Sequence, residues 1–425
     1  MRPPGAEQPA LGSTGASPAG ARPSPATLED TEVAGLAQVA TASFLASRVV
    51  PSGGFFVALA GGIALARVAQ QRGAREGYGA SAAAMIETVA IMGPPRFTIP
   101  FTQAATAPML GRLEARAVGP LAQMLACAAV RVLLNAVGVA FFIWVVGGLE
   151  AYAGSYDAIA ERLGFSVSER ATVLVTLAGL LVWGGFASGV QVWVYRRGLR
   201  DWSTGPDEQG EVPAAPSPHD GRFDARAVAL AAAIGFALLL ASTDWVLLGA
   251  VAGWLAIAWV LARPDMSAAP TGLALAGLLA GSALVFTLVG GLGLDLALRR
   301  AARAALLVLV ATWLRAAAGA DGLREVFRRL LGVLRRVPSA PEAAKVLDRI
   351  GSEGRLTAAG RSLSDALSAV PRQALPVLDA VLAWVAGEAG RFRAGALPPR
   401  LSLHARPPDA VLLVAALAPA AALAL

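Results

Sequence analysis

Residues 117–147 read AVGPLAQMLACAAVRVLLNAVGVAFFIWVVG, an apolar run that holds a single charged side chain, Arg131. As one α-helix the run would be about 45 Å long, which exceeds the ~30 Å hydrocarbon core of a bilayer. We therefore expect a membrane-spanning helix that tilts or projects into the cytoplasm. Residues 173–195 form a second apolar run, which ends in Trp193 and Tyr195, aromatic residues typical of a membrane interface.

The composition extends this interpretation to the whole chain. Of 425 residues, 56% are hydrophobic and 15% are charged, and the mean hydropathy is +0.59. A soluble domain has roughly a quarter charged residues, so a single-core soluble protein is excluded. We expect an all-α polytopic integral membrane protein, with about 7–9 transmembrane helices in two modules plus a cytoplasmic amphipathic helical region.

The rare residue types argue against catalysis and metal binding. The one cysteine, Cys127, forms no internal disulfide, and His219 and His404 lie far apart in Pro-rich segments. Lys345 is the only lysine, and the sequence contains no nucleophile–base set or phosphate-binding glycine loop. We therefore expect no enzyme, no cofactor and no metal site.

The charge distribution predicts the partners and the location. The net charge of +7 is carried almost wholly by arginine. On an apolar chain, such an excess indicates loops near anionic lipid, so we expect the lipid bilayer as a partner and no nucleic acid. The arginine preference is typical of a GC-rich bacterial genome, and we expect a multi-pass protein of the bacterial cell (inner) membrane.

Changes of composition along the chain divide it into segments. The expected segments are a disordered tail (1–31), a first transmembrane module (32–200), a polar Pro-rich linker (201–223), a second transmembrane module (224–319), a cytoplasmic amphipathic helical region (320–407) and an apolar tail or last span (408–425). In the first module, residues 33–50 and 54–69 are expected to form either a hairpin of two spans or interfacial helices.

The positive-inside rule predicts the topology. Clusters of arginine place residues 112–116 and 196–200 on the cytoplasmic side of the membrane, and the acidic loop 150–169 is expected on the outer side. Residues 196–225 and 320–407 are therefore expected to be cytoplasmic. Four spans would then lie between these two regions, at 226–242, 245–262, 272–292 and 303–319. On this topology Arg299, Arg300 and Arg303 fall outside, so either they lie within the bundle or the number of spans differs by one.

Residues 78–110 contain the most unusual polar pattern. Glu87 lies in a run of small residues, prolines interrupt the helix at 94–95, and three threonines follow at four-residue spacing. Transporters use proline-broken helices of this kind to expose oxygen atoms at membrane depth. The alternative is an ordered cytoplasmic loop at 93–116. The candidate intramembrane polar site comprises Glu87, Arg96, Thr98, Thr102, Gln103, Thr106, Arg131 and Asn135.

The depth of Arg131 decides its expected role. If the apolar core starts near Gln123, Arg131 lies well inside and should pair with an acid, and Glu87 is the nearest in sequence. If the core starts near Val132, the Arg131 side chain instead reaches the cytoplasmic edge of the bilayer.

Residues 320–337 predict a basic amphipathic helix, because apolar residues recur at helical spacing among arginines. A second helix is expected after Ser339, which starts a capping box with Glu342, and a third around 376–392. The candidate partner- or lipid-contact residues are Arg324, Arg328, Arg329, Arg335 and Arg336.

Part of this region resembles a known family. Residues 307–312, 322–331, 334–338 and 342–344 are similar to the transmembrane T component of energy-coupling-factor transporters, and the likeness covers about 272–350. The resemblance implies amphipathic helices beneath the membrane that couple paired ATPases to a substrate-binding membrane subunit. The Ala-Arg-Gly signatures of the family are not matched, because 359–361 and 389–391 hold these residues in another order.

Three functions follow as hypotheses. The first is a membrane subunit of a transport or coupling assembly, with other membrane subunits or a separate ATPase as partners. The second is a structural or scaffolding membrane protein whose basic helix lies on anionic lipid. The third is a secondary transporter with its site at the proline-broken segment 94–108.

Overall fold

The computed structural model describes residues 28–48, 54–93, 98–162, 164, 168–200, 202, 222–262, 269–371, 373–393, 401 and 403–423. Over these residues the chain forms helices and no strand, so the all-α prediction is confirmed. The expected tail and linker lie almost entirely outside the described residues. The elements are α1 (Asp30–Ala46), α2 (Gly54–Arg72), α3 (Ala74–Met92), α4 (Thr98–Ala115), α5 (Pro120–Phe142), η2 (Ile143–Gly147), α6 (Leu149–Arg162), α7 (Glu169–Arg200), α8 (Ala225–Ala241), α9 (Trp245–Ala262), α10 (Ala269–Val289), α11 (Leu294–Val333), α12 (Ala340–Leu347), α13 (Glu353–Ser368), α14 (Ala374–Arg393), α15 (Pro407–Leu417) and η4 (Ala418–Leu423).

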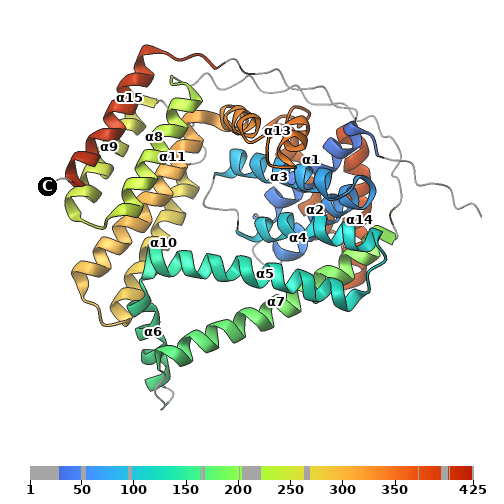
Figure 1. The fold of residues 1–425 in the computed structure, drawn as a ribbon, viewed down its shortest axis with the longest axis horizontal. Coiled ribbons are helices and arrows are strands. Elements are labelled where there is room, and N and C mark those ends of the chain that lie inside the picture. Colours follow the sequence, from blue (N-terminus) through green and yellow to red (C-terminus); the bar gives the residue numbers. More distant parts are fainter. Residues whose placement is uncertain are drawn as a thin grey trace, which may run out of the picture.

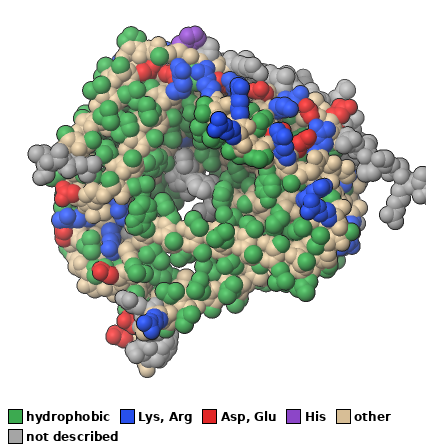
Figure 2. Space-filling model, viewed as in Figure 1, with side chains coloured by type: hydrophobic (Ala, Val, Ile, Leu, Met, Phe, Trp, Pro, Cys, Tyr) green, Lys and Arg blue, Asp and Glu red, His purple; other side chains and the backbone are tan. Residues whose placement is uncertain are grey.

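Six of the described helices are long and apolar enough to cross a membrane, namely α2, α5, α7, α9, α10 and α11. The surfaces of α5 and α7 are strongly apolar, and Leu133, Trp144, Leu174 and Val182 are all well exposed. Figure 2 shows hydrophobic side chains over most of the visible face. Exposed apolar surface this extensive is unfavourable in water and indicates contact with lipid or another apolar partner.

The first hydrophobic core joins the N-terminal helices to the C-terminal amphipathic helices. It includes Phe44 of α1, Ile63 of α2 and Leu110 of α4, together with Leu363 of α13 and Val385 of α14. The C-terminal helices of the expected amphipathic region therefore bury their apolar stripes against protein, as an amphipathic helix does when a partner surface is at hand.

The second core lies in the other half of the molecule (Figure 1). It is formed by α8, α9, the first half of α11 and α15, with Trp254 and Trp313 in edge-to-face contact at 5.5 Å between ring centroids. The apolar C-terminal run contributes Leu412 and Ala416 of α15 to this core.

Two connections join the cores. Helix α11 is broken at Gly319 (φ 69°, ψ 165°), and its second half leaves the second core to pack on α3 and α12. Only glycine adopts this backbone conformation readily. The span that we expected to end at Gly319 and the basic helix that we expected after it are thus the two halves of one broken helix. At the opposite edge α5 and α7 lie close together near the first core and diverge toward α6, which contacts α10 (Figure 1).

Of the three arginines that fall outside by the positive-inside rule, Arg303 is buried. It donates hydrogen bonds to the carbonyl oxygens of Trp144 and Val145 in η2. Arg299 forms an ion pair with Asp295 at 2.9 Å. The structure therefore places Arg303, but not the whole group, within the helix packing.

Candidate functional site

Helix α4 supplies the hydroxyl stripe of the site. Because residues four apart lie on one face of a helix, Thr102 and Thr106 both point inward and are buried, as is Gln103. The Thr106 hydroxyl donates to the Thr102 carbonyl oxygen at 2.6 Å, a bond that threonine often forms within helices. Thr98 opens α4, but its side chain and the whole of Arg96 lie outside the described residues.

Helix α5 brings Arg131 to this stripe. The side chain is buried, with 2% of its surface exposed. Its Nη2 donates to Gln191 Oε1 of α7 at 2.6 Å, and its Nη1 donates to Thr102 Oγ1 at 3.4 Å. The guanidinium also lies 5.6 Å from the ring centroid of Phe55 in α2, a cation–π arrangement. Arg131 of α5 therefore reaches inward to side chains of α2, α4 and α7.

Helix α7 completes the site with residues that the sequence did not single out as site residues. Gln191 Nε2 donates to Thr106 Oγ1 at 2.8 Å, and Gln191 Oε1 also accepts from Cys127 Sγ at 3.1 Å. One turn further along, the Tyr195 hydroxyl donates to Gln103 Oε1 at 2.9 Å. The expectation that Tyr195 is an interfacial aromatic residue is wrong, because its whole side chain is buried. We name these residues the Arg131 cluster: Thr102, Gln103, Thr106, Cys127, Arg131, Gln191 and Tyr195.

Small residues on α2 make this packing possible. A Cβ atom at Gly62 would overlap the Tyr195 hydroxyl, so only glycine leaves room for that hydroxyl to reach Gln103. A Cβ atom at Gly111 of α4 would overlap the Ala66 carbonyl of α2 in the same way. Close approach of α2 and α4 therefore depends on glycine, as is typical of helix pairs in membranes.

The Arg131 cluster is rich in hydrogen-bond donors and carries a positive charge. Within the described part of the chain, no carboxylate forms an ion pair with Arg131, and its Nε atom has no hydrogen-bond partner. Gln103 Nε2 is also buried without a partner among the described residues. Burying a charge is costly unless an opposite charge compensates it. A carboxylate or phosphate would supply the opposite charge that Arg131 lacks among the described residues.

Glu87 belongs to a different part of the fold. Its carboxylate is fully buried on α3 and pairs with Arg324 of α11, whose Nε donates to Glu87 Oε2 at 2.7 Å. The suggested pair between Glu87 and Arg131 is therefore wrong. Arg324 is also not a surface contact residue, because the break at Gly319 directs the second half of α11 across α3.

A second buried arginine lies beside this pair. Arg315 donates to the Ile91 carbonyl oxygen at 2.7 Å and to both carboxylate oxygens of Glu353 at 2.8 and 3.0 Å. Burial raises the pKa of Glu353 above its usual range, although Arg315 opposes this shift. Together the two ion pairs tie α3, α11 and α13 to one another.

The remaining candidates are dispersed. Arg328 and Arg329 pair with Glu325 at 2.6 and 2.8 Å, while Arg335 and Arg336 are exposed in the turn after α11. Asn135 is half-buried one turn beyond Arg131 and takes no part in the hydrogen bonds of the Arg131 cluster. Among the described residues, no group of three or more histidine, cysteine or acidic side chains could hold a metal ion.

No protein-family model, curated protein or solved structure matches this chain. The resemblance to the T component of energy-coupling-factor transporters thus stays a prediction.

Proposed function

We propose that this chain is a multi-pass membrane protein that binds an anionic solute at the Arg131 cluster as part of a transport process. The observation that carries this proposal is a buried guanidinium, at the meeting point of four helices, with no carboxylate partner among the described residues. The proposal develops the hypothesis of a transporter whose site includes the threonine stripe of α4.

Charge compensation favours an anionic ligand at the Arg131 cluster. A charge within a bilayer costs about 2.5–3.5 kcal/mol on insertion scales, and neutral partners such as Gln191 and Thr102 compensate only part of it. A carboxylate or phosphate would supply the missing negative charge and could accept two parallel bonds from the guanidinium. The unpartnered amide nitrogen of Gln103 offers a further donor nearby.

The proposed membrane placement follows from helix length and arginine distribution. Besides the six helices that are long enough to cross, α8 and the Pro407–Ala421 segment are apolar but shorter. With these the chain would reach the expected seven to nine transmembrane helices. The arginine pattern favours the inner membrane of a bacterium, with 196–225 and 320–407 on the cytoplasmic side.

A binding measurement on the purified full-length chain tests the proposal. In nanodiscs we would titrate radiolabelled inorganic phosphate and succinate against the wild type, Arg131→Gln and Arg170→Gln. Arg170 is an exposed arginine at the start of α7 and serves as the matched control. Loss of a charged hydrogen bond worth about 1.5–3 kcal/mol should weaken binding about 10- to 100-fold in Arg131→Gln alone. Equal binding by the two variants, or no binding of either anion by the wild type, would contradict the proposal.

A second function is favoured by the exposed end of α11. Val333 has 81% of its surface exposed, and Leu334, Val337, Arg335 and Arg336 are exposed beside it. We propose that this basic and apolar patch contacts another membrane subunit or a separate ATPase, as in a coupling assembly. The scaffolding alternative has the same patch lying on anionic lipid.

Cross-linking separates these two possibilities. A photoreactive residue placed at Val333 in cells should give a discrete protein adduct if the patch binds a subunit. Under the scaffolding alternative the adduct should be lipid only, and Arg335→Glu/Arg336→Glu should not change which proteins copurify. A lipid adduct without any protein adduct would end the coupling proposal.

A further inference from the structure

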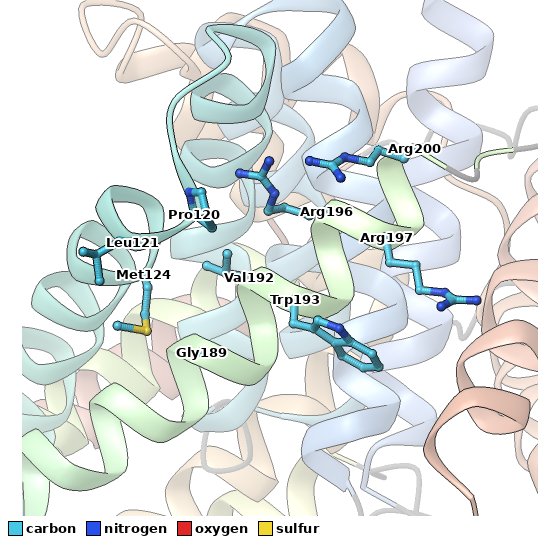
Figure 3. A pocket seen from close by; sticks show the side chains of 9 residues that line it. All are labelled: Pro120, Leu121, Met124, Gly189, Val192, Trp193, Arg196, Arg197 and Arg200. Carbon is cyan, nitrogen blue, oxygen red and sulfur yellow. The ribbon is translucent and has the colours of Figure 1, made fainter.

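A cavity of about 630 Å³ lies between the first turns of α5 and the last turns of α7. We propose that it binds one anionic glycerophospholipid, with the phosphate at its arginine end and an acyl chain along its apolar side. The inference rests on the proposed membrane placement, but it does not depend on anion binding at Arg131. Figure 3 shows the residues that line the cavity.

Among the described residues, the arginine end of the cavity has more positive than negative charge in contact with it. Arg196 and Arg200 extend toward the same end (Figure 3) and share one carboxylate, Glu114, at 3.3 and 3.5 Å. Glu114 also accepts a hydrogen bond from Gln123 at 2.7 Å. One carboxylate cannot neutralise two guanidinium groups, so a phosphate at this end gains a favourable charge interaction. Arg197 points the other way and lies 3.6 Å from Asp379 of α14.

The other side of the cavity is apolar and continuous with the exposed surface of the helix pair. Leu121 of α5 and Trp193 of α7 are both exposed at the cavity. Along the same face of α7, Phe186 and Val182 follow at helical spacing and are also exposed. An acyl chain can lie along this stripe, while a tryptophan at the boundary between phosphate and chain is typical of membrane interfaces.

Lipid fits this cavity better than free phosphate does. A free anion would contact only the arginine end and would leave the apolar wall unused, whereas a phospholipid satisfies both ends at once. The cavity is also separate from the Arg131 cluster. Trp193 lies two residues from Gln191 and therefore on the opposite side of α7, away from α4.

Native mass spectrometry of the full-length chain tests the inference. The delipidated protein in detergent would be titrated with phosphatidylglycerol and with phosphatidylcholine of the same acyl chains. We expect preferential retention of phosphatidylglycerol, and Arg196→Gln/Arg200→Gln should weaken it by about five-fold for each arginine removed. The control, Arg162→Gln/Arg170→Gln, removes two exposed arginines outside the cavity and should leave retention unchanged.

A second variant tests the cavity without changing its charge. A Cβ atom at Gly189 meets only Met124 Sδ, at an ordinary 3.6 Å, so Gly189→Leu should fold and fill the cavity. It should lose phosphatidylglycerol as the arginine variant does. Unchanged retention in both variants would overturn the proposal. Displacement of phosphatidylglycerol by millimolar inorganic phosphate at constant ionic strength would show that the site recognises the free anion, which would also overturn it.

Discussion

At the residue scale, the pair of Glu87 and Arg324 shows how a buried charge is compensated in this fold. The two side chains are 237 residues apart in sequence and almost fully buried, and Arg324 also donates to the Gly351 carbonyl oxygen at 3.1 Å. Arg131, by contrast, has only neutral hydrogen-bond partners among the described residues. The first arrangement is expected to stabilise the packing of α3 on α11, whereas the second leaves a buried charge without a carboxylate partner among the described residues.

This difference leads to a prediction for Glu87 and Arg324. Arg324→Gln leaves the buried Glu87 carboxylate as an unpaired charge, which costs about 3–5 kcal/mol, whereas Glu87→Gln leaves Arg324 with Asp321 at 3.2 Å. Arg324→Gln should therefore lower the unfolding temperature in detergent strongly, Glu87→Gln should lower it less, and the double variant should lose less than the sum of the two. Additive losses would show that the two side chains do not compensate one another.

The sequence predicted part of the Arg131 cluster but not all of it. Thr102, Gln103, Thr106 and Arg131 could be singled out, because polar residues in an apolar run are unusual and the threonine spacing is helical. Gln191 is the only side-chain amide in the run 173–195, and this was the signal in the sequence that could have identified the contribution of α7 to the cluster. Which arginine Glu87 pairs with could not be predicted, because helix contacts and not sequence distance decide it.

At the element scale, the start of α8 carries a pH-dependent cap. The Asp224 carboxylate accepts a bond from the Arg226 backbone N–H at 2.8 Å and from the Arg226 guanidinium at 3.0 and 2.9 Å. Burial opposes ionisation of Asp224, but these bonds outweigh it and hold the pKa below its usual value of 3.8. Asp409 accepts a hydrogen bond from the Asp224 backbone N–H, which links the start of α8 to that of α15.

The sign of the pH effect follows from the lowered pKa. The stabilisation is complete above pH 3.8, the usual value, and is lost as the pH falls from there through the folded-state pKa. In detergent, the unfolding temperature of the wild type should fall more steeply between pH 6 and pH 3 than that of Asp224→Asn. Asparagine retains the cap but does not titrate. Parallel acid profiles would contradict the assignment of this effect to Asp224.

Helix positions were more predictable than helix partners. The run 173–195 lies within α7, and the helix expected after Ser339 begins at Ala340, because apolar period and capping residues are local signals. The packing of α13 and α14 on α1 is not local, since it joins residues more than 300 positions apart and depends on the break at Gly319. Periodicity alone indicates an apolar face and does not indicate what covers it.

At the scale of the whole molecule, the apolar helices differ in what surrounds them. Helix α2 is mostly buried inside the protein, whereas α5 and α7 are mostly exposed although they are more apolar. Such an arrangement is stable if lipid surrounds α5 and α7, and it would lead to aggregation in water. Both the proposed anion binding at Arg131 and the proposed lipid binding in the cavity depend on this placement.

Alkaline carbonate extraction of membranes from cells that express the full-length chain tests this placement most directly. The account predicts that the chain stays in the membrane pellet at pH 11 and enters solution only with detergent, as integral proteins with several spans do. Release of the chain into the carbonate supernatant without detergent would contradict the account and remove the basis of both binding proposals.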